Sequence, residues 1–184
     1  MYDFGHISRI INKQKYEWST RLEIAEAALY SLAGFFLPFM LGHPQWLVGT
    51  IVNAMLISGA LTVRGYKLLP IILLPSLGVL AAGLIFGNFT VFLLYLIPFI
   101  WMGNAVLVGA FKFFNVHKRW KYFPTLIIGS VTKAGFLFAA AFALYHLGLV
   151  PVVFLTAMGW LQLLTALSGG VLAFGFEKVK RIIC

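Results

Sequence analysis

The chain has 184 residues, of which 61% are hydrophobic and only 10% are charged, and its mean hydropathy is +0.96. Soluble domains carry about 25% charged residues, so this composition excludes an ordinary water-soluble protein and indicates an integral membrane protein. The single cysteine, Cys184, excludes an internal disulfide and a cysteine-ligated zinc or iron–sulfur centre. The formal net charge of +9 is open to two interpretations, nucleic-acid binding and membrane topology.

The first 21 residues predict a short amphipathic helix at the membrane surface. Ile7, Ile10 and Ile11 fall at helical spacing among polar and basic residues. An apolar stripe of this kind is typical of a helix that lies in the interface. The stretch has no compact apolar core with a cleavage site, so we expect no signal peptide.

Six apolar runs follow, each long enough for a membrane-spanning helix. A span needs about 20 mostly apolar residues to cross roughly 30 Å of hydrocarbon. Because backbone groups in lipid must bond internally, these runs predict helices. The predicted spans are 23–42, 46–63, 68–86, 90–111, 124–145 and 152–176. Together they predict a transmembrane domain over 22–178, followed by a short basic tail over 179–184.

The basic residues divide this bundle into two ends. If the N-terminus is cytoplasmic, every lysine and arginine but one lies before span one, after spans two and four, or after span six. This is the positive-inside pattern. We therefore predict an all-α, compact bundle of six transmembrane helices in the cell (plasma) membrane, with both termini cytoplasmic. The net charge then reflects topology and anionic lipid, and no nucleic acid is expected as a partner.

The exception is Lys133, in the run GSVTKAGFLFAAAFAL of span five. It lies about nine residues into the span, or roughly 14 Å deep. A lysine at mid-membrane costs about 2.5–3.5 kcal/mol, so it should face the bundle interior and have a partner. We favour a cation that lines a substrate or ion site. A structural clamp and snorkelling to the interface are the alternatives.

Three amides are expected at comparable depth on three other spans: Asn53, Asn104 and Gln162. An amide in hydrocarbon usually bonds across helices, so each one alone is more typical of structural packing. Taken together with Lys133, they predict a polar pocket inside the bundle.

Two histidines, His43 and His146, fall in loops on the side without basic residues. They are loop residues or substrate contacts, and we include both in the candidate binding site. Two imidazoles alone lack the further ligands of a closed metal site, so we expect no metal. On the cytoplasmic side, we expect Glu26 to pair with Arg21 or to be exposed.

Two stretches resemble the substrate-binding S components of energy-coupling factor (ECF) vitamin transporters. They are PQWLVGTIVNAMLISGALTVRGYKLLPIILLPSLGVLAAGLIFGN and YLIPFIWMGNAVLVGAFKFF. The shared features are six spans, an asparagine in span two, a span three marked by proline and glycine, and P…GN in span four. The resemblance covers roughly residues 22–178 and is one of pattern.

The resemblance implies that a substrate is bound from outside, with Asn104, Lys133 and Gln162 as pocket positions. It also implies that small residues of the first three helices dock on a coupling membrane protein with cytoplasmic ATPase subunits. Ala27, Ser31 and Ala33 would be docking positions. Internal packing is the alternative for these small residues, because they let any two helix backbones approach closely.

These patterns predict a membrane-embedded, substrate-binding subunit of an uptake transporter for a small, vitamin-like and possibly anionic molecule. The alternative is a non-transporting anchor subunit of a larger complex, such as a redox or hydrogenase assembly. No nucleophile elbow, HExxH, phosphate loop or paired acidic motif is apparent, so we expect neither an enzyme nor a cofactor.

Overall fold

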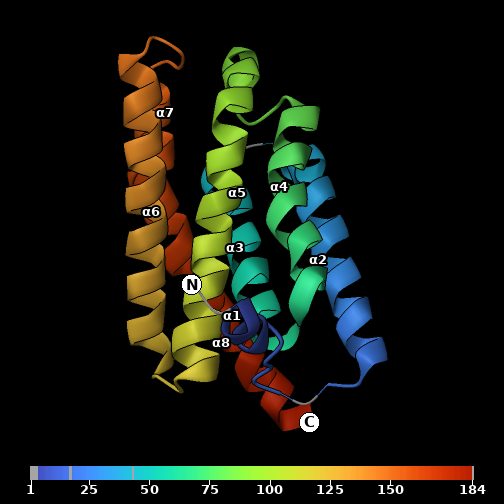
Figure 1. The fold of residues 1–184 in the computed structure, drawn as a ribbon. Helices are drawn as coiled ribbons and strands as arrows, with labels where there is room; N and C mark the ends of the chain where they lie inside the picture. Colours follow the sequence, from blue (N-terminus) through green and yellow to red (C-terminus); the bar gives the residue numbers. More distant parts are fainter. Residues whose placement is uncertain (1–3, 17, 43, 184) are drawn as a thin grey trace.

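The computed structural model describes residues 4–16, 18–42 and 44–183, and every regular element in these ranges is helical. A short helix, α1 (Phe4–Ile11), precedes the bundle (Figure 1). The longer helices are α2 (Thr20–Leu41), α3 (Gln45–Thr62), α4 (Leu68–Ala82), α5 (Leu93–Ala110), α6 (Tyr122–His146) and α8 (Trp160–Ile183). The shorter ones are η1 (Gly65–Lys67), η2 (Gly87–Phe92), η3 (Phe111–His117) and α7 (Val153–Met158).

Six of the resulting helical segments are long and apolar enough to cross a membrane, which confirms the predicted all-α bundle. They differ from the predicted spans mainly at their ends. The third span stops at Ala82 instead of residue 86, because Gly83 adopts a left-handed conformation (φ 68°) and caps the helix. The fourth span continues through the π-helix η3 to His117, beyond the predicted end at residue 111.

The sixth span is interrupted at Gly159, between α7 and α8. A Cβ atom added at Gly159 would lie 2.8 Å from the Phe138 ring of α6. Only glycine permits this close approach, because real Cβ contacts are longer. The break divides the sixth predicted span, 152–176, into two helices.

Glycines also bring helix backbones close together. An added Cβ at Gly78 of α4 would lie 2.2 Å from the carbonyl oxygen of Phe35 on α2. At Gly169 of α8 it would lie 2.5 Å from the carbonyl oxygen of Thr50 on α3. Small residues therefore set two helix–helix interfaces inside this bundle.

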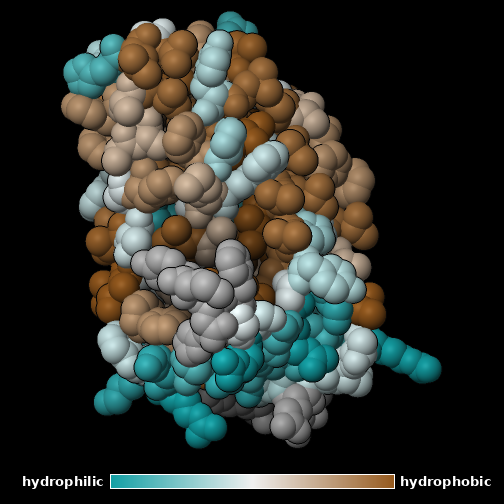
Figure 2. All heavy atoms as spheres, in the orientation of Figure 1, coloured by the Kyte–Doolittle hydropathy of each residue, from teal (hydrophilic) through white to brown (hydrophobic). Residues whose placement is uncertain are grey.

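The outer surface of the bundle is apolar, as a membrane-spanning domain requires. Leu29 of α2 and Ile127 of α6 are 63% and 55% exposed. Hydrophobic side chains cover most of the visible face, whereas hydrophilic ones gather at its lower end (Figure 2). We call this lower end the basic end. The N-terminal segment, the α3–α4 connection and the η3–α6 connection lie there (Figure 1) and carry Lys13, Lys15, Arg64, Lys67, Lys118, Arg119 and Lys121. The start of α2 and the end of α8 both lie at the basic end (Figure 1).

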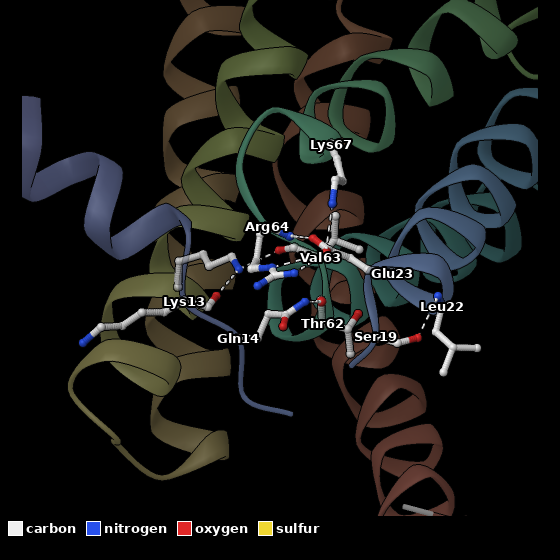
Figure 3. Close-up of polar contacts among 10 residues, drawn as sticks. Lys13, Gln14, Ser19, Leu22, Glu23, Thr62, Val63, Arg64 and Lys67 are labelled. Atoms are coloured by element: carbon white, nitrogen blue, oxygen red, sulfur yellow. Dashed lines mark hydrogen bonds and ion pairs between the residues drawn. The ribbon is translucent and has the colours of Figure 1, made fainter. Parts of the chain in front are cut away.

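The buried carboxylate of Glu23 organises part of the basic end (Figure 3). It accepts hydrogen bonds from the Arg64 guanidinium at 2.8 Å and from the Arg64 backbone N–H at 2.6 Å. Lys67 Nζ lies 2.9 Å from the same carboxylate. The hydrogen bond and the negative charge of Glu23 raise the pKa of Arg64. These contacts join the first turn of α2 to the connection between α3 and α4.

The N-terminal segment is tied to the same connection. Gln14 Nε2 donates to the Thr62 carbonyl (Figure 3). Lys112 Nζ donates to the carbonyls of Lys13 and Val63 at 2.6 and 2.7 Å. Lys112 is only 1% exposed, and the acceptors of both hydrogen bonds are backbone carbonyls. The ammonium therefore acts as a clamp that holds the N-terminal segment against the end of α3.

Glu26 has a different partner from the one expected from the sequence. It accepts from Lys180, near the end of α8, and from Tyr30 one helical turn away. Arg21 is exposed and takes no part in this contact. The expectation of an Arg21 pair or of exposure is therefore wrong, because Glu26 is buried and its carboxylate pairs with Lys180.

Candidate binding site

A cavity lies inside the bundle, between α3, α4, α5, α6 and the α7–α8 segment. Its volume is about 90 Å³, which is room for several water molecules or a small ligand. At one end it is lined by Gln45, Phe86 and Leu93, which lie near the ends of helices remote from the basic end. At its inner end it is lined by Asn53, Asn104, Lys133 and Gln162. We call it the Lys133 cavity.

Lys133 is 2% exposed and forms the polar end of this cavity. Its Nζ donates to Asn53 Oδ1 at 2.6 Å and to Asn104 Oδ1 at 2.8 Å. Three helices, α3, α5 and α6, therefore meet at one ammonium group. The contacts are hydrogen bonds between a charged donor and neutral acceptors.

The two asparagines are held in the orientation that presents oxygen to Lys133. Asn53 Nδ2 donates to the Gly49 carbonyl at 2.9 Å and lies 3.2 Å from Thr165 Oγ1. Asn104 Nδ2 donates to the Ile72 carbonyl at 3.0 Å. Because each amide nitrogen already has an acceptor, each amide oxygen is directed toward the ammonium.

No carboxylate neutralises Lys133 within residues 4–16, 18–42 and 44–183. The glutamates in these ranges, Glu23, Glu26 and Glu177, all lie near the basic end and pair with other cations. An ammonium has three N–H donors, and the described contacts of Lys133 use two of them. A positive charge with spare donor capacity therefore lines the cavity.

Gln162 adds a second unmet polar group. Its Oε1 is buried and has no hydrogen-bond partner in the part of the chain that the structure describes. Buried polar groups in native proteins are usually paired, so an unpaired one beside a cavity indicates a place for a ligand or an ordered water molecule. The cavity thus offers both a cationic donor and a neutral acceptor.

The remaining walls are mostly apolar. They include Val52, Val79, Ile85, Ile100 and Met158, and Pro75 and Ser76 complete the α4 side. An apolar cavity with a few convergent polar groups is typical of a small-molecule site. The arrangement suits a compact ligand with an apolar body and one anionic or strongly accepting group.

The four polar residues predicted at mid-depth thus lie around one cavity. The two predicted histidines have different outcomes. His146 is exposed at the end of α6, with its ring 4.4 Å from the Phe142 ring, and is not among the residues that line the cavity. His43 lies outside the described residues.

Some residues of the site were missed from the sequence. Gln45 directly follows the HP dipeptide of the first outer loop, and this position was the only feature of the sequence that could have suggested a role in binding. Ser76 accepts from Trp101 Nε1 at 2.8 Å, which fixes the α4–α5 wall. Thr165 supports Asn53 from α8. Hydroxyl groups occur throughout helices, so neither Ser76 nor Thr165 carries a distinct sequence signal.

The predicted docking residues face inward to different extents. Ala27 and Ser31 are 7% and 5% exposed, and Ser31 Oγ donates to the Ala27 carbonyl at 2.6 Å. Both also line an open, apolar groove between α2 and the start of α4, near Leu69. Ala33 is half-buried and does not line this groove. Docking at these three positions stays a prediction.

Comparison of the chain with protein-family models, with curated proteins and with solved structures finds no match.

Proposed function

We propose that this protein is the membrane-embedded, substrate-binding subunit of an uptake transporter for a small organic acid. The observation that carries the proposal is Lys133, a buried ammonium that lines a cavity and has only neutral hydrogen-bond partners among the described residues. A bound carboxylate or other acidic group would supply the missing negative charge.

The cost of burying a charge favours a role for Lys133 in binding a ligand over a purely structural role. A charge at mid-membrane costs several kcal/mol unless it is paired, and two amide oxygens offset only part of that cost. A ligand anion would gain from the low dielectric constant of the site and from the free N–H of Lys133. Gln162 Oε1 would accept from a hydroxyl or amine of the same ligand.

The orientation in the membrane belongs to the same proposal. The basic end would face the cytoplasm of a cell with this protein in its plasma membrane. The Lys133 cavity, which extends toward the opposite end, would then receive its substrate from outside. A coupling membrane protein with ATPase subunits would drive release. The sequence resemblance supports this last step.

The test combines ligand identification with one substitution. The protein is purified gently, and small molecules released on denaturation are identified by mass spectrometry. We expect an organic acid with wild-type protein. With Lys133→Met, which keeps much of the side-chain volume, we expect at least about tenfold weaker binding, or about 1.4 kcal/mol. The melting temperature of the empty protein should stay unchanged or rise, because removing an unpaired charge from mid-membrane offsets the loss of the two hydrogen bonds to Asn53 and Asn104.

Lys112→Met is the matched control, because Lys112 is also buried but does not line the Lys133 cavity. It should lower the melting temperature, since two backbone carbonyls lose their donor. Ligand binding by the folded fraction should stay unchanged. If Lys133→Met lowers stability in the same way and binds the acid normally, Lys133 is a structural clamp. A membrane anchor without a substrate would then be the better interpretation.

A further inference from the structure

A second cavity lies at the basic end and shares no lining residue with the Lys133 cavity. It has a volume of about 420 Å³. The N-terminal segment, the end of η3, the following loop and α8 surround it. Its lining includes Lys15, Asn115, Arg119, Lys121, Tyr122 and Phe174. We call it the basic cavity.

Two cations of this cavity lack an acidic partner. Arg119 and Lys121 are exposed, and no salt bridge joins either to a carboxylate in the described residues. Lys15 differs, because its Nζ lies 2.9 Å from Glu177 Oε2 and its charge is largely balanced. Among the described residues that line it, the basic cavity therefore carries an excess of about two positive charges.

The backbone at Arg119 is strained. Its φ is 58°, and it is the one residue other than glycine with positive φ in the described ranges. Glycine would adopt this conformation without cost, whereas other residues pay a steric penalty. The residues on both sides of Arg119 are held by the preceding helix: the Lys118 N–H donates to the Phe113 carbonyl and the Trp120 N–H to the Phe114 carbonyl, each at 2.9 Å. Asn115 Nδ2 also donates to the Trp120 carbonyl at 2.9 Å. Arg119 thus ends η3 in a left-handed conformation, and this position places it among the residues that line the basic cavity.

Asn115 supplies an unmet acceptor. It is 7% exposed, and its buried Oδ1 has no hydrogen-bond partner among the residues that the structure describes. The nitrogen of the same amide already donates to the Trp120 carbonyl, so only the oxygen is left without a hydrogen-bond partner among the described residues. A ligand of this cavity would satisfy Asn115 with a hydroxyl or amine hydrogen.

One wall of the cavity is apolar and leads to the outer surface of the bundle. Phe174 packs on Tyr122 and on Phe123, with ring centroids 5.0 and 5.1 Å apart. Phe123 is 49% exposed and Ile127, one turn further along α6, is 55% exposed. An acyl chain attached to a group in the basic cavity would therefore have a continuous apolar path along α6.

We infer that the basic cavity binds an anionic glycerophospholipid whose headgroup bears a hydroxyl, as in phosphatidylglycerol. Arg119 and Lys121 hold the phosphate, and the headgroup hydroxyl donates to Asn115 Oδ1. The acyl chains follow Tyr122, Phe174 and Phe123 into the bilayer. Basic pockets between membrane helices are suited to such headgroups. Free phosphate shares the anionic chemistry but would leave the apolar wall uncovered. This site does not depend on the proposed transport function.

The experiment measures lipid retention by native mass spectrometry. The full-length protein is equilibrated in mixed micelles with equal amounts of phosphatidylglycerol and phosphatidylcholine. We expect the wild type to retain phosphatidylglycerol selectively. The double variant Arg119→Gly/Lys121→Gln should retain about tenfold less, because both phosphate contacts are lost. Glycine suits the backbone at position 119, so this variant should fold, as judged by its elution volume and circular dichroism.

Lys118→Gln is the matched control, since Lys118 is an exposed cation in the same loop but does not line the cavity. It should retain the lipid like the wild type. Equal losses in both variants, or no loss in the double variant, would overturn the inference, because retention would then reflect general surface charge. If Arg119→Gly/Lys121→Gln fails to fold, Lys121→Gln alone is compared with Lys118→Gln by the same criterion.

Two further ligands test whether the cavity binds the phosphate of a lipid or free phosphate. Inorganic phosphate, added as a competitor at the same concentration, should not displace phosphatidylglycerol. If it does so completely, the cavity binds free phosphate and the lipid assignment is wrong. Phosphatidylmethanol has the same charge without the headgroup hydroxyl, so it should be retained less well than phosphatidylglycerol. Equal retention would overturn the role of Asn115.

Discussion

Lys133 on α6 donates a hydrogen bond of 2.6 Å to Asn53 on α3, across 80 residues of sequence. The same ammonium donates to Asn104 on α5 at 2.8 Å. Three helices are thus tied together by a charge that their side chains solvate but do not neutralise. The glutamates of the described residues stand far away at the basic end, each beside another cation. This separation of charge makes the Lys133 cavity a place where an anion from outside the chain would be stabilised.

Gly78→Ala tests the close contact between α2 and α4. The new methyl group would lie 2.2 Å from the Phe35 carbonyl oxygen, so the two helices would have to move apart. We expect the free energy of unfolding to fall by about 1–3 kcal/mol. Titration with a denaturing detergent, followed by circular dichroism, measures this change. Gly109→Ala is the control: nothing lies within 4 Å of its added Cβ, so stability should stay the same or rise slightly.

The orientation of the bundle is testable with single cysteines in a Cys184→Ser background. Asn88 and Leu147 are exposed at the end remote from the basic residues, whereas Tyr66 is 80% exposed at the basic end. In intact cells, cysteines at positions 88 and 147 should react with an impermeant maleimide. A cysteine at position 66 should react only after the cells are opened. The reverse pattern would place the basic end outside and remove the proposed direction of substrate access.

Glu23→Gln tests the network at the basic end. Glu23 is fully buried and accepts from Arg64 and Lys67, so the neutral amide would weaken two charge-assisted contacts. We expect a loss of about 1–3 kcal/mol in the free energy of unfolding, measured by the same detergent titration. Arg21→Gln removes an exposed charge from the same helical turn and should leave stability unchanged. Equal effects would mean that the contacts of Glu23 add no more to stability than an exposed charged residue of the same turn.

The number of spans was predictable because bilayer thickness sets helix length, and apolar runs report that length directly. The positions where the third and sixth spans break, at Gly83 and Gly159, were not predictable. Gly83 lies inside an apolar run, and the close contact of Gly159 with the Phe138 ring is visible only in the folded structure. Hydropathy also cannot tell an inward face of small residues from an outward one. Ala27 and Ser31 are an example: both are largely buried, although their spacing in the sequence would equally suit an exposed surface.

The polar residues of the candidate site were predictable from depth alone. An amide or ammonium at mid-membrane must face other polar groups, so Asn53, Asn104 and Lys133 were expected to share the interior. Partner choice at the ends was not predictable in this way. Glu26 pairs with Lys180, 154 residues away, although Arg21 is much nearer in sequence. Only the fold, which places the start of α2 and the end of α8 at the same end of the bundle (Figure 1), brings these two side chains together.

Asn104→Asp tests directly whether the charge of Lys133 is reserved for a ligand. The new carboxylate would lie beside the ammonium, where Asn104 Oδ1 is now 2.8 Å away, and would neutralise it. Its second oxygen would face the Ile72 carbonyl, so one hydrogen bond of about 1 kcal/mol is lost. Because the ion pair offsets this loss, the melting temperature of the empty protein should change little. Binding of the co-purified organic acid should weaken at least about tenfold, or about 1.4 kcal/mol, as measured by equilibrium dialysis. Asn88→Asp makes the same substitution at an exposed position and should bind the acid normally. If Asn104→Asp also binds it normally, the ligand does not depend on a free positive charge, and Lys133 is not its anion partner.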